Sequence, residues 1–167
     1  GARGPNPDDK GVNTFGAHFA QVAVNVETGQ LRVERVVTAH DIGRVVNPMT
    51  AESQVYGGVI MGMGFCTSEE RVIDPDTGLQ LTPDLEEYKV PTLTDIPEIE
   101  VYFVDVADTE ANSVGSKGLG EPPIIPVAPA IANAVFDAVG VRATDLPMTP
   151  DRLLRLLAEA RQMAPKE

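Results

Sequence analysis

The hydrophobic pattern of this 167-residue chain has a period of two in some segments and a period of three to four in others. Val22, Val24 and Val26 alternate with polar or small residues, and the alternation resumes after a turn signal at residues 27–30. Alternation on both sides of a turn predicts a β-hairpin with one buried face. A further alternating stretch at residues 99–104 predicts another strand.

Three other segments have the apolar spacing of helices. The second helix in chain order is expected to begin near Pro126, because a proline in a helix interior costs ~3 kcal/mol. It is expected to end at Gly140. The third opens after Thr149 as N-cap. The first covers residues 50–65, and its expected buried face is Val55, Val59, Gly62 or Met63, and Phe65.

The segments between these elements are rich in turn residues. Residues 1–12 are expected to form a loop, the chain leaves the sheet at residues 40–43, and residues 83–97 form an extended connection. Asp74 and Asp76 fit a tight turn better than a calcium loop, because the spacing of an EF-hand is absent. The sequence therefore predicts an α+β fold, a hairpin and mixed strands packed with about three helices.

Composition narrows the class of protein. A hydrophobic content of 43% is that of a globular protein, and a net charge of −12 argues against nucleic acid or an anionic membrane as partner. No apolar run approaches the ~20 residues that span a bilayer. The single cysteine, Cys66, excludes an internal disulfide, fits a reducing, cytoplasmic compartment and is expected to be a core residue.

The glycine-rich sequence at residues 115–121 is the first candidate for chemistry. Its glycines allow close approach to a ligand, and Glu121 before two prolines would lie near a helix N-terminus, where an ionised carboxylate can act as a general base. A helix that starts only at Pro126 places Glu121 on the approach instead. Spacing alone also fits a plain turn whose glutamate caps a helix.

A second candidate is the glycine-rich helix that contains Gly57, Gly58, Gly62 and Gly64. Each helical glycine costs ~1 kcal/mol relative to alanine, so we expect close packing against a helix or a ligand. Gln54, on the turn before them, fits either a ligand contact or an ordinary helix-surface glutamine.

Other catalytic patterns are absent from the sequence. His18 and His40 lack the spacing of a zinc or iron site, and a structural hydrogen bond is expected for each. There is no nucleophile elbow, dinucleotide fingerprint or P-loop.

Three segments, residues 15–37, 41–70 and 115–150, resemble the molybdenum hydroxylases, the xanthine dehydrogenase and aldehyde oxidase family, in that family's order. The resemblance implies that Glu121 is the active-site base and that Gln54 hydrogen-bonds the pterin. It also implies that the backbone at Lys117, Gly118 and Gly120 lies against the cofactor. The implied reaction hydroxylates an aldehyde or N-heterocycle with water as oxygen donor.

The same resemblance implies the cofactors and partners. The cofactor is molybdopterin with molybdenum, in a form such as the cytosine dinucleotide, and the pterin dithiolene rather than a protein side chain holds the metal. Iron–sulfur and FAD centres are expected on partner domains or subunits.

The family's molybdenum subunit is several times longer than this chain, so residues 1–167 are expected to be its C-terminal portion. The upstream part would then supply the side chains that choose the small-molecule substrate, and the isolated chain would be inactive. The alternative is a catalytically silent assembly module that needs the upstream half.

Overall fold

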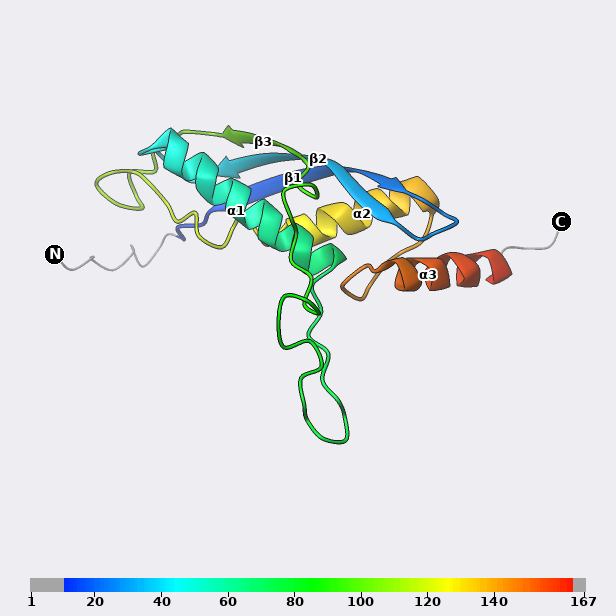
Figure 1. The fold of residues 1–167 in the computed structure, drawn as a ribbon. Helices are drawn as coiled ribbons and strands as arrows, with labels where there is room; N and C mark the ends of the chain where they lie inside the picture. Colours follow the sequence, from blue (N-terminus) through cyan, green and yellow to red (C-terminus); the bar gives the residue numbers. More distant parts are fainter. Residues whose placement is uncertain (1–10, 164–167) are drawn as a thin grey trace.

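The computed structural model describes residues 11–163 and confirms the α+β fold, with three strands and three helices in that range (Figure 1). Most of the loop expected at residues 1–12 lies outside the described residues. The elements, in chain order, are β1 (Phe15–Val24), β2 (Leu31–Asp41), α1 (Pro48–Thr67), β3 (Glu98–Phe103), α2 (Val127–Val139) and α3 (Pro150–Met163).

The three strands form one mixed sheet in the order β1-β2-β3. β1 and β2 are the predicted hairpin, and β3 pairs with β2 in parallel. β2 continues to Asp41, so the expected departure from the sheet at residue 40 is wrong. β2 extends this far because it pairs with a strand on each side. Asp41 is opposite Phe15 in β1, and His40 is opposite Phe103 in β3.

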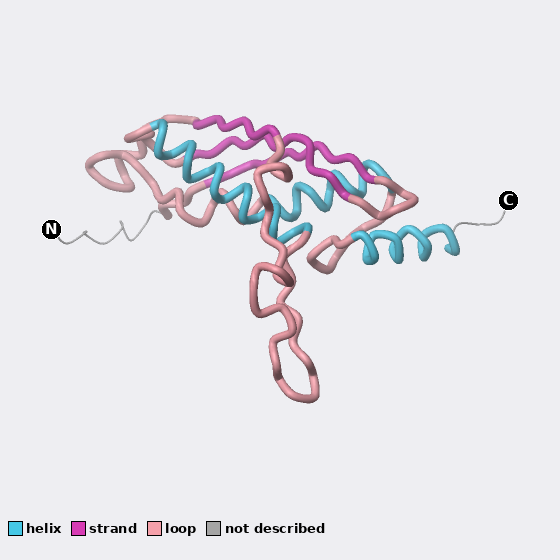
Figure 2. Tube along the Cα trace, in the orientation of Figure 1, coloured by secondary structure: helices cyan, strands magenta, loops and turns pink. Residues whose placement is uncertain are grey.

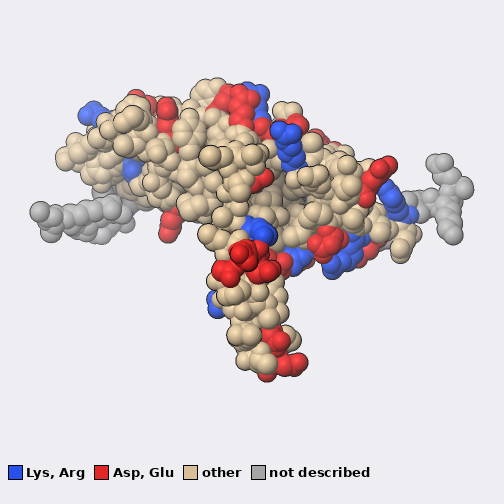
Figure 3. Space-filling view, in the orientation of Figure 1, with Lys and Arg blue, Asp and Glu red and all other residues tan. Residues whose placement is uncertain are grey.

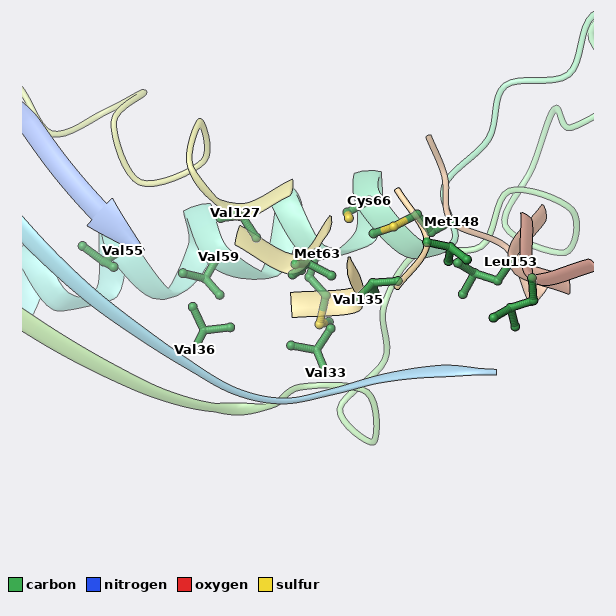
Figure 4. Close-up of a cluster of buried hydrophobic side chains, with 13 residues drawn as sticks. Val33, Val36, Val55, Val59, Met63, Cys66, Val127, Val135, Met148 and Leu153 are labelled. Atoms are coloured by element: carbon green, nitrogen blue, oxygen red, sulfur yellow. The ribbon is translucent and has the colours of Figure 1, made fainter. Parts of the chain in front are cut away.

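α1 and α2 cover one face of the sheet and enclose the core (Figures 1 and 4). Cys66 lies in this core, as predicted, and is fully buried. Burial raises the pKa of its thiol to about 12. The buried cluster consists of Val33, Val36, Val55, Val59, Met63, Cys66, Val127, Ile131, Val135, Val141, Met148, Leu153 and Leu157.

The glycines of α1 allow α2 and the segment before it to approach closely. A Cβ placed on Gly58 would lie 2.5 Å from Pro123 Cβ, and one on Gly62 would lie 2.7 Å from Val127 Cβ. Gly57 has open space instead. The buried glycines therefore serve close packing, which was one of the two interpretations of the pattern.

Phe65 is the one wrong member of the predicted buried face of α1. Its side chain is 59% exposed, because the buried face runs through Val55, Val59 and Met63 and ends at Cys66. Gly140, with φ of 73°, ends α2 as predicted.

Residues 68–96 form no strand or helix, and the middle of this segment projects away from the layered body (Figure 2). The predicted turn at Asp74 is confirmed, since its carboxylate accepts from the amides of Asp76 and Thr77. Acidic side chains gather on this projecting segment in the view of Figure 3.

Candidate functional site

The loop at residues 115–121 is fixed to the end of β2 by backbone hydrogen bonds. The amide of Lys117 donates to the Ile42 carbonyl at 2.7 Å, and the amide of Arg44 donates to the Gly115 carbonyl at 2.7 Å. Gly115 has φ of 78°, which favours glycine, and a Cβ there would also meet Ala107 at 2.9 Å. This conformation turns the chain back toward the sheet.

The side chain of Lys117 is buried at this junction. Its Nζ lies 2.9 Å from Asp41 Oδ2 and 3.9 Å from Asp108 Oδ2, and only 6% of the side chain is exposed. The hydrogen bond from Lys117 lowers the pKa of the Asp41 carboxyl, and the Gly43 amide reinforces the effect. The ammonium is therefore already paired within the protein, and of the backbone polar groups only the carbonyl of Lys117 remains for the predicted cofactor contact, since its amide donates to Ile42.

Glu121 lies in an exposed turn between two anchored positions. Leu119 packs against the core on one side, and Pro123 is buried against Gly58 on the other. The Glu121 side chain makes no hydrogen bond or ion pair with any residue from 11 to 163. α2 begins only at Val127, so Glu121 lies outside its first turn, as the proline positions indicated.

Gln54 lies on the same side of the molecule as this turn. Gln54 and Gly58 are four residues apart on α1 and so share one face, about 6 Å along the axis. Because Gly58 contacts Pro123, Gln54 lies one helical turn from the segment that carries Glu121. The side chain of Gln54 is exposed and has no partner among the described residues.

Gly118 and Gly120 leave room for a ligand at the loop. Both are exposed, and a Cβ on either would have no neighbour within 4 Å. The Thr14 hydroxyl donates to the Gly118 carbonyl at 3.0 Å, which steadies the loop from the start of β1. The loop therefore presents exposed backbone at Gly118 and Gly120, and the unpaired carboxylate of Glu121 follows directly after it.

Three residues of this arrangement were missed from the sequence: Asp41, Asp108 and Asn112. The side-chain oxygen of Asn112 accepts from the amide of Gly115 at 2.8 Å, and its nitrogen donates to the Ser116 carbonyl at 2.7 Å. Asp41 is 76 residues from Lys117 (117 − 41), so no local spacing could reveal the pair. The local signal for Asn112 was its position three residues before a glycine.

The two histidines form the structural hydrogen bond expected of them, and they form it with each other. Within residues 11–163, no three His, Cys, Asp or Glu side chains lie close enough to hold a metal ion. Over the same range, no helix combines the length and apolarity needed to cross a membrane.

Comparison with known proteins places this arrangement in a family. Residues 3–97 match the molybdopterin cofactor-binding domain. The chain is 44% identical over 139 residues to the xanthine dehydrogenase molybdenum-binding subunit of Escherichia coli O157:H7, covering 83% of the chain and 18% of that subunit. It is 42% identical over 147 residues to the aldehyde oxidoreductase molybdenum-binding subunit PaoC of Escherichia coli K12, covering 88% and 20%.

The fold is also similar to that of solved enzymes. Quinoline 2-oxidoreductase from Pseudomonas putida 86 superposes with a TM-score of 0.80 and 31% identity, over 86% of this chain and 18% of that one. The chain thus spans about a fifth of the length of the proteins it matches.

Proposed function

This chain belongs to the molybdopterin cofactor-binding domain family of the molybdenum hydroxylases, and we propose that it supplies the general base and part of the cofactor cradle of such an enzyme. Glu121 is the proposed base. Gln54 and the backbone at Lys117, Gly118 and Gly120 are the proposed cofactor contacts.

The observation that carries this proposal is the free Glu121 carboxylate on an anchored loop. A general base needs a carboxylate that is held in a defined place and is free to take a proton, and an ion pair with Lys or Arg would lower its basicity. Asp41 and Glu100 are paired with Lys117 and Arg35, whereas Glu121 has no partner among the described residues. The anchors at Leu119 and Pro123 limit how far its backbone can move.

The reaction proposed is the hydroxylation of an aldehyde or N-heterocycle. Substrate carbon exchanges its hydrogen for a hydroxyl from water, and two protons and two electrons are released. The bound molybdenum cofactor, proposed in a pterin form such as the cytosine dinucleotide, would accept the two electrons, which then pass to iron–sulfur and flavin partners. A carboxylate oxygen of Glu121 takes a proton from the water that becomes the hydroxyl.

We further propose that residues 1–167 work as the C-terminal portion of a longer molybdenum-binding subunit. The support is the length of the matched relatives, which are about five times longer than the segment that aligns with this chain. The upstream part would complete the pocket and select the substrate. The isolated chain should therefore bind little molybdenum and show no turnover.

The test is the Glu121→Gln variant of the complete subunit, because glutamine keeps the shape of the side chain and removes its basicity. Turnover of an aldehyde or purine should fall ~10²–10⁴-fold, the usual contribution of a positioned base, with molybdenum and pterin contents unchanged. Glu87→Gln, an exposed glutamate on the projecting segment, is the matched control and should keep full activity. Retained turnover in Glu121→Gln would reject the assignment.

A second candidate function, a silent assembly module, is favoured by the open face of the sheet. α1 and α2 cover one face only, and on the other Phe15, Phe19 and Tyr102 are 63%, 70% and 56% exposed. Large apolar side chains gathered on one face are typical of an interface. Metal analysis and an oxidation assay on the assembled subunit separate the two candidates, since only an enzyme has turnover that depends on Glu121.

A further inference from the structure

The buried ammonium of Lys117 has a structural role that a contact with the cofactor does not explain. Its ammonium lies 2.9 Å from Asp41 at the last position of β2 and 3.9 Å from Asp108 in the loop after β3. Asp41 is itself fixed, because its other carboxylate oxygen accepts from the Gly43 amide at 3.1 Å. The Lys117 ammonium thus joins the end of β2 to the connection that follows β3.

Backbone contacts reinforce the same junction. Gly43 and Ser116 form an isolated antiparallel bridge, so the glycine loop continues the edge of the sheet for one residue pair. The Asn112 side chain accepts from the Ser116 amide at 3.3 Å and donates to the Ser116 carbonyl. The start of the loop is therefore held from both sides, and Glu121 follows five residues later.

We propose that Asp41 is a positioning residue that acts through Lys117 to set the place of the Glu121 carboxylate. The inference rests on the proposed function of Glu121 and assigns Lys117 to the same positioning role. Neutralising Asp41 leaves a buried ammonium with only the more distant Asp108, a charge that low-dielectric surroundings penalise. The loop then gains freedom at Lys117, and the carboxylate beyond it loses its fixed position.

The first arm of the test measures the loop directly in the chain, without cofactor or turnover. Within residues 115–121 the hydrogen-bonded amides are those of Gly115, Ser116 and Lys117, and their exchange should be about tenfold faster or more in Asp41→Asn than in the wild type, because the loop opens locally. Glu100→Gln is the matched control: it removes the partner of Arg35 on the same sheet, away from this loop. Exchange at residues 115–121 should be unchanged in Glu100→Gln.

The second arm uses the complete molybdenum-loaded subunit. Asp41→Asn should lower kcat by about 10–100-fold, the cost of a misplaced catalytic group, while KM and molybdenum content stay within about twofold of the wild type. Asp41→Glu keeps the charge and should recover part of the lost kcat. The double variant with Lys117→Met and Asp41→Asn should lower kcat no more than the worse of the two single variants, since the two residues act as one unit.

The outcomes separate this inference from the proposed function. Unchanged exchange at residues 115–121 in Asp41→Asn overturns the positioning role, whatever Glu121 does. Faster exchange with an unchanged kcat overturns it as well, because a loosened loop would then be without effect on turnover. Full turnover in Glu121→Gln rejects the proposed base, and the exchange result would still show whether Asp41 holds the loop.

Discussion

The Nε2 atoms of His18 and His40 lie 3.1 Å apart, and their rings meet edge to face with centroids 5.0 Å apart. His40 is fully buried, and neither Nδ1 has a partner among the described residues. A Cβ on Gly16 would lie 2.8 Å from His40 Nδ1 and 3.8 Å from the Pro122 carbonyl. Gly16 therefore lies between His40 and the Pro122 carbonyl, next to the turn that carries Glu121.

Acid should destabilise the chain through this pair before its carboxylates titrate. Burial, and then the neighbouring His40, lower the pKa of His18 from 6.5 to about 4, and burial also lowers the pKa of His40. A depressed pKa means that the unfolded state binds more protons than the folded state. This stability is complete above about pH 6.5 and is lost as the pH falls toward 4.

The measurement is the free energy of urea unfolding at pH 7 and at pH 5. We expect a loss of up to about 2 kcal/mol for His18, reduced somewhat by its partial exposure. His18→Asn should flatten this dependence. The carboxyls of Asp41 and Glu100, whose pKa values are lowered by Lys117 and Arg35, contribute only at lower pH. An equal pH dependence in wild type and variant would contradict the account.

Adding a methyl group to neighbouring glycines of α1 should have opposite effects. Gly57→Ala meets open space and should stabilise the helix by up to ~1 kcal/mol. Gly58→Ala places a Cβ against Pro123 and should destabilise the chain by about 1–3 kcal/mol, as overpacking does. Thermal unfolding of both variants checks the pair. A Gly58→Ala variant as stable as Gly57→Ala would mean that the Pro123 contact is wrong.

Cys66 should resist thiol reagents in the folded chain. The side chain is fully buried, and burial raises its thiol pKa to about 12, so little thiolate exists at pH 8. Labelling by a chromogenic disulfide should be slow without denaturant and complete in urea. Rapid labelling of the folded chain would show that the contact between α1 and the core opens readily.

The open face of the sheet should be needed for joining the rest of the subunit. Phe19→Asp replaces a side chain that is already exposed, so the stability of the chain itself should change little. A buried carboxylate at an interface is costly, and co-purification with the upstream part of the subunit should be lost. Leu93→Asp, on the exposed connection before β3, is the control. Unchanged co-purification of Phe19→Asp would remove the support for an interface here.

Elements with strong local signals were predictable from the sequence. The hairpin follows from alternation around the turn at residues 27–30, and the prolines between residues 122 and 129 fix where α2 can begin. The exposed Phe65 was not predictable, because its spacing on α1 fits the buried face and only the position of α2 shows where that face ends.

The site was predictable only in part. Glu121 and Gln54 were proposed from motifs, and the structure brings their segments together through Gly58 and Pro123. The pair of Lys117 with Asp41 depends on where the loop meets the end of β2, which a single sequence does not encode locally. Their roles toward the cofactor stay predictions.

The most direct measurement is a crystal structure of the complete subunit with its molybdenum cofactor bound. We expect the Glu121 carboxylate to lie within hydrogen-bond reach of the metal's oxygen ligand, at about 2.6–3.2 Å or through one water. A carboxylate that faces solvent, with the cofactor seated elsewhere in the subunit, would contradict it.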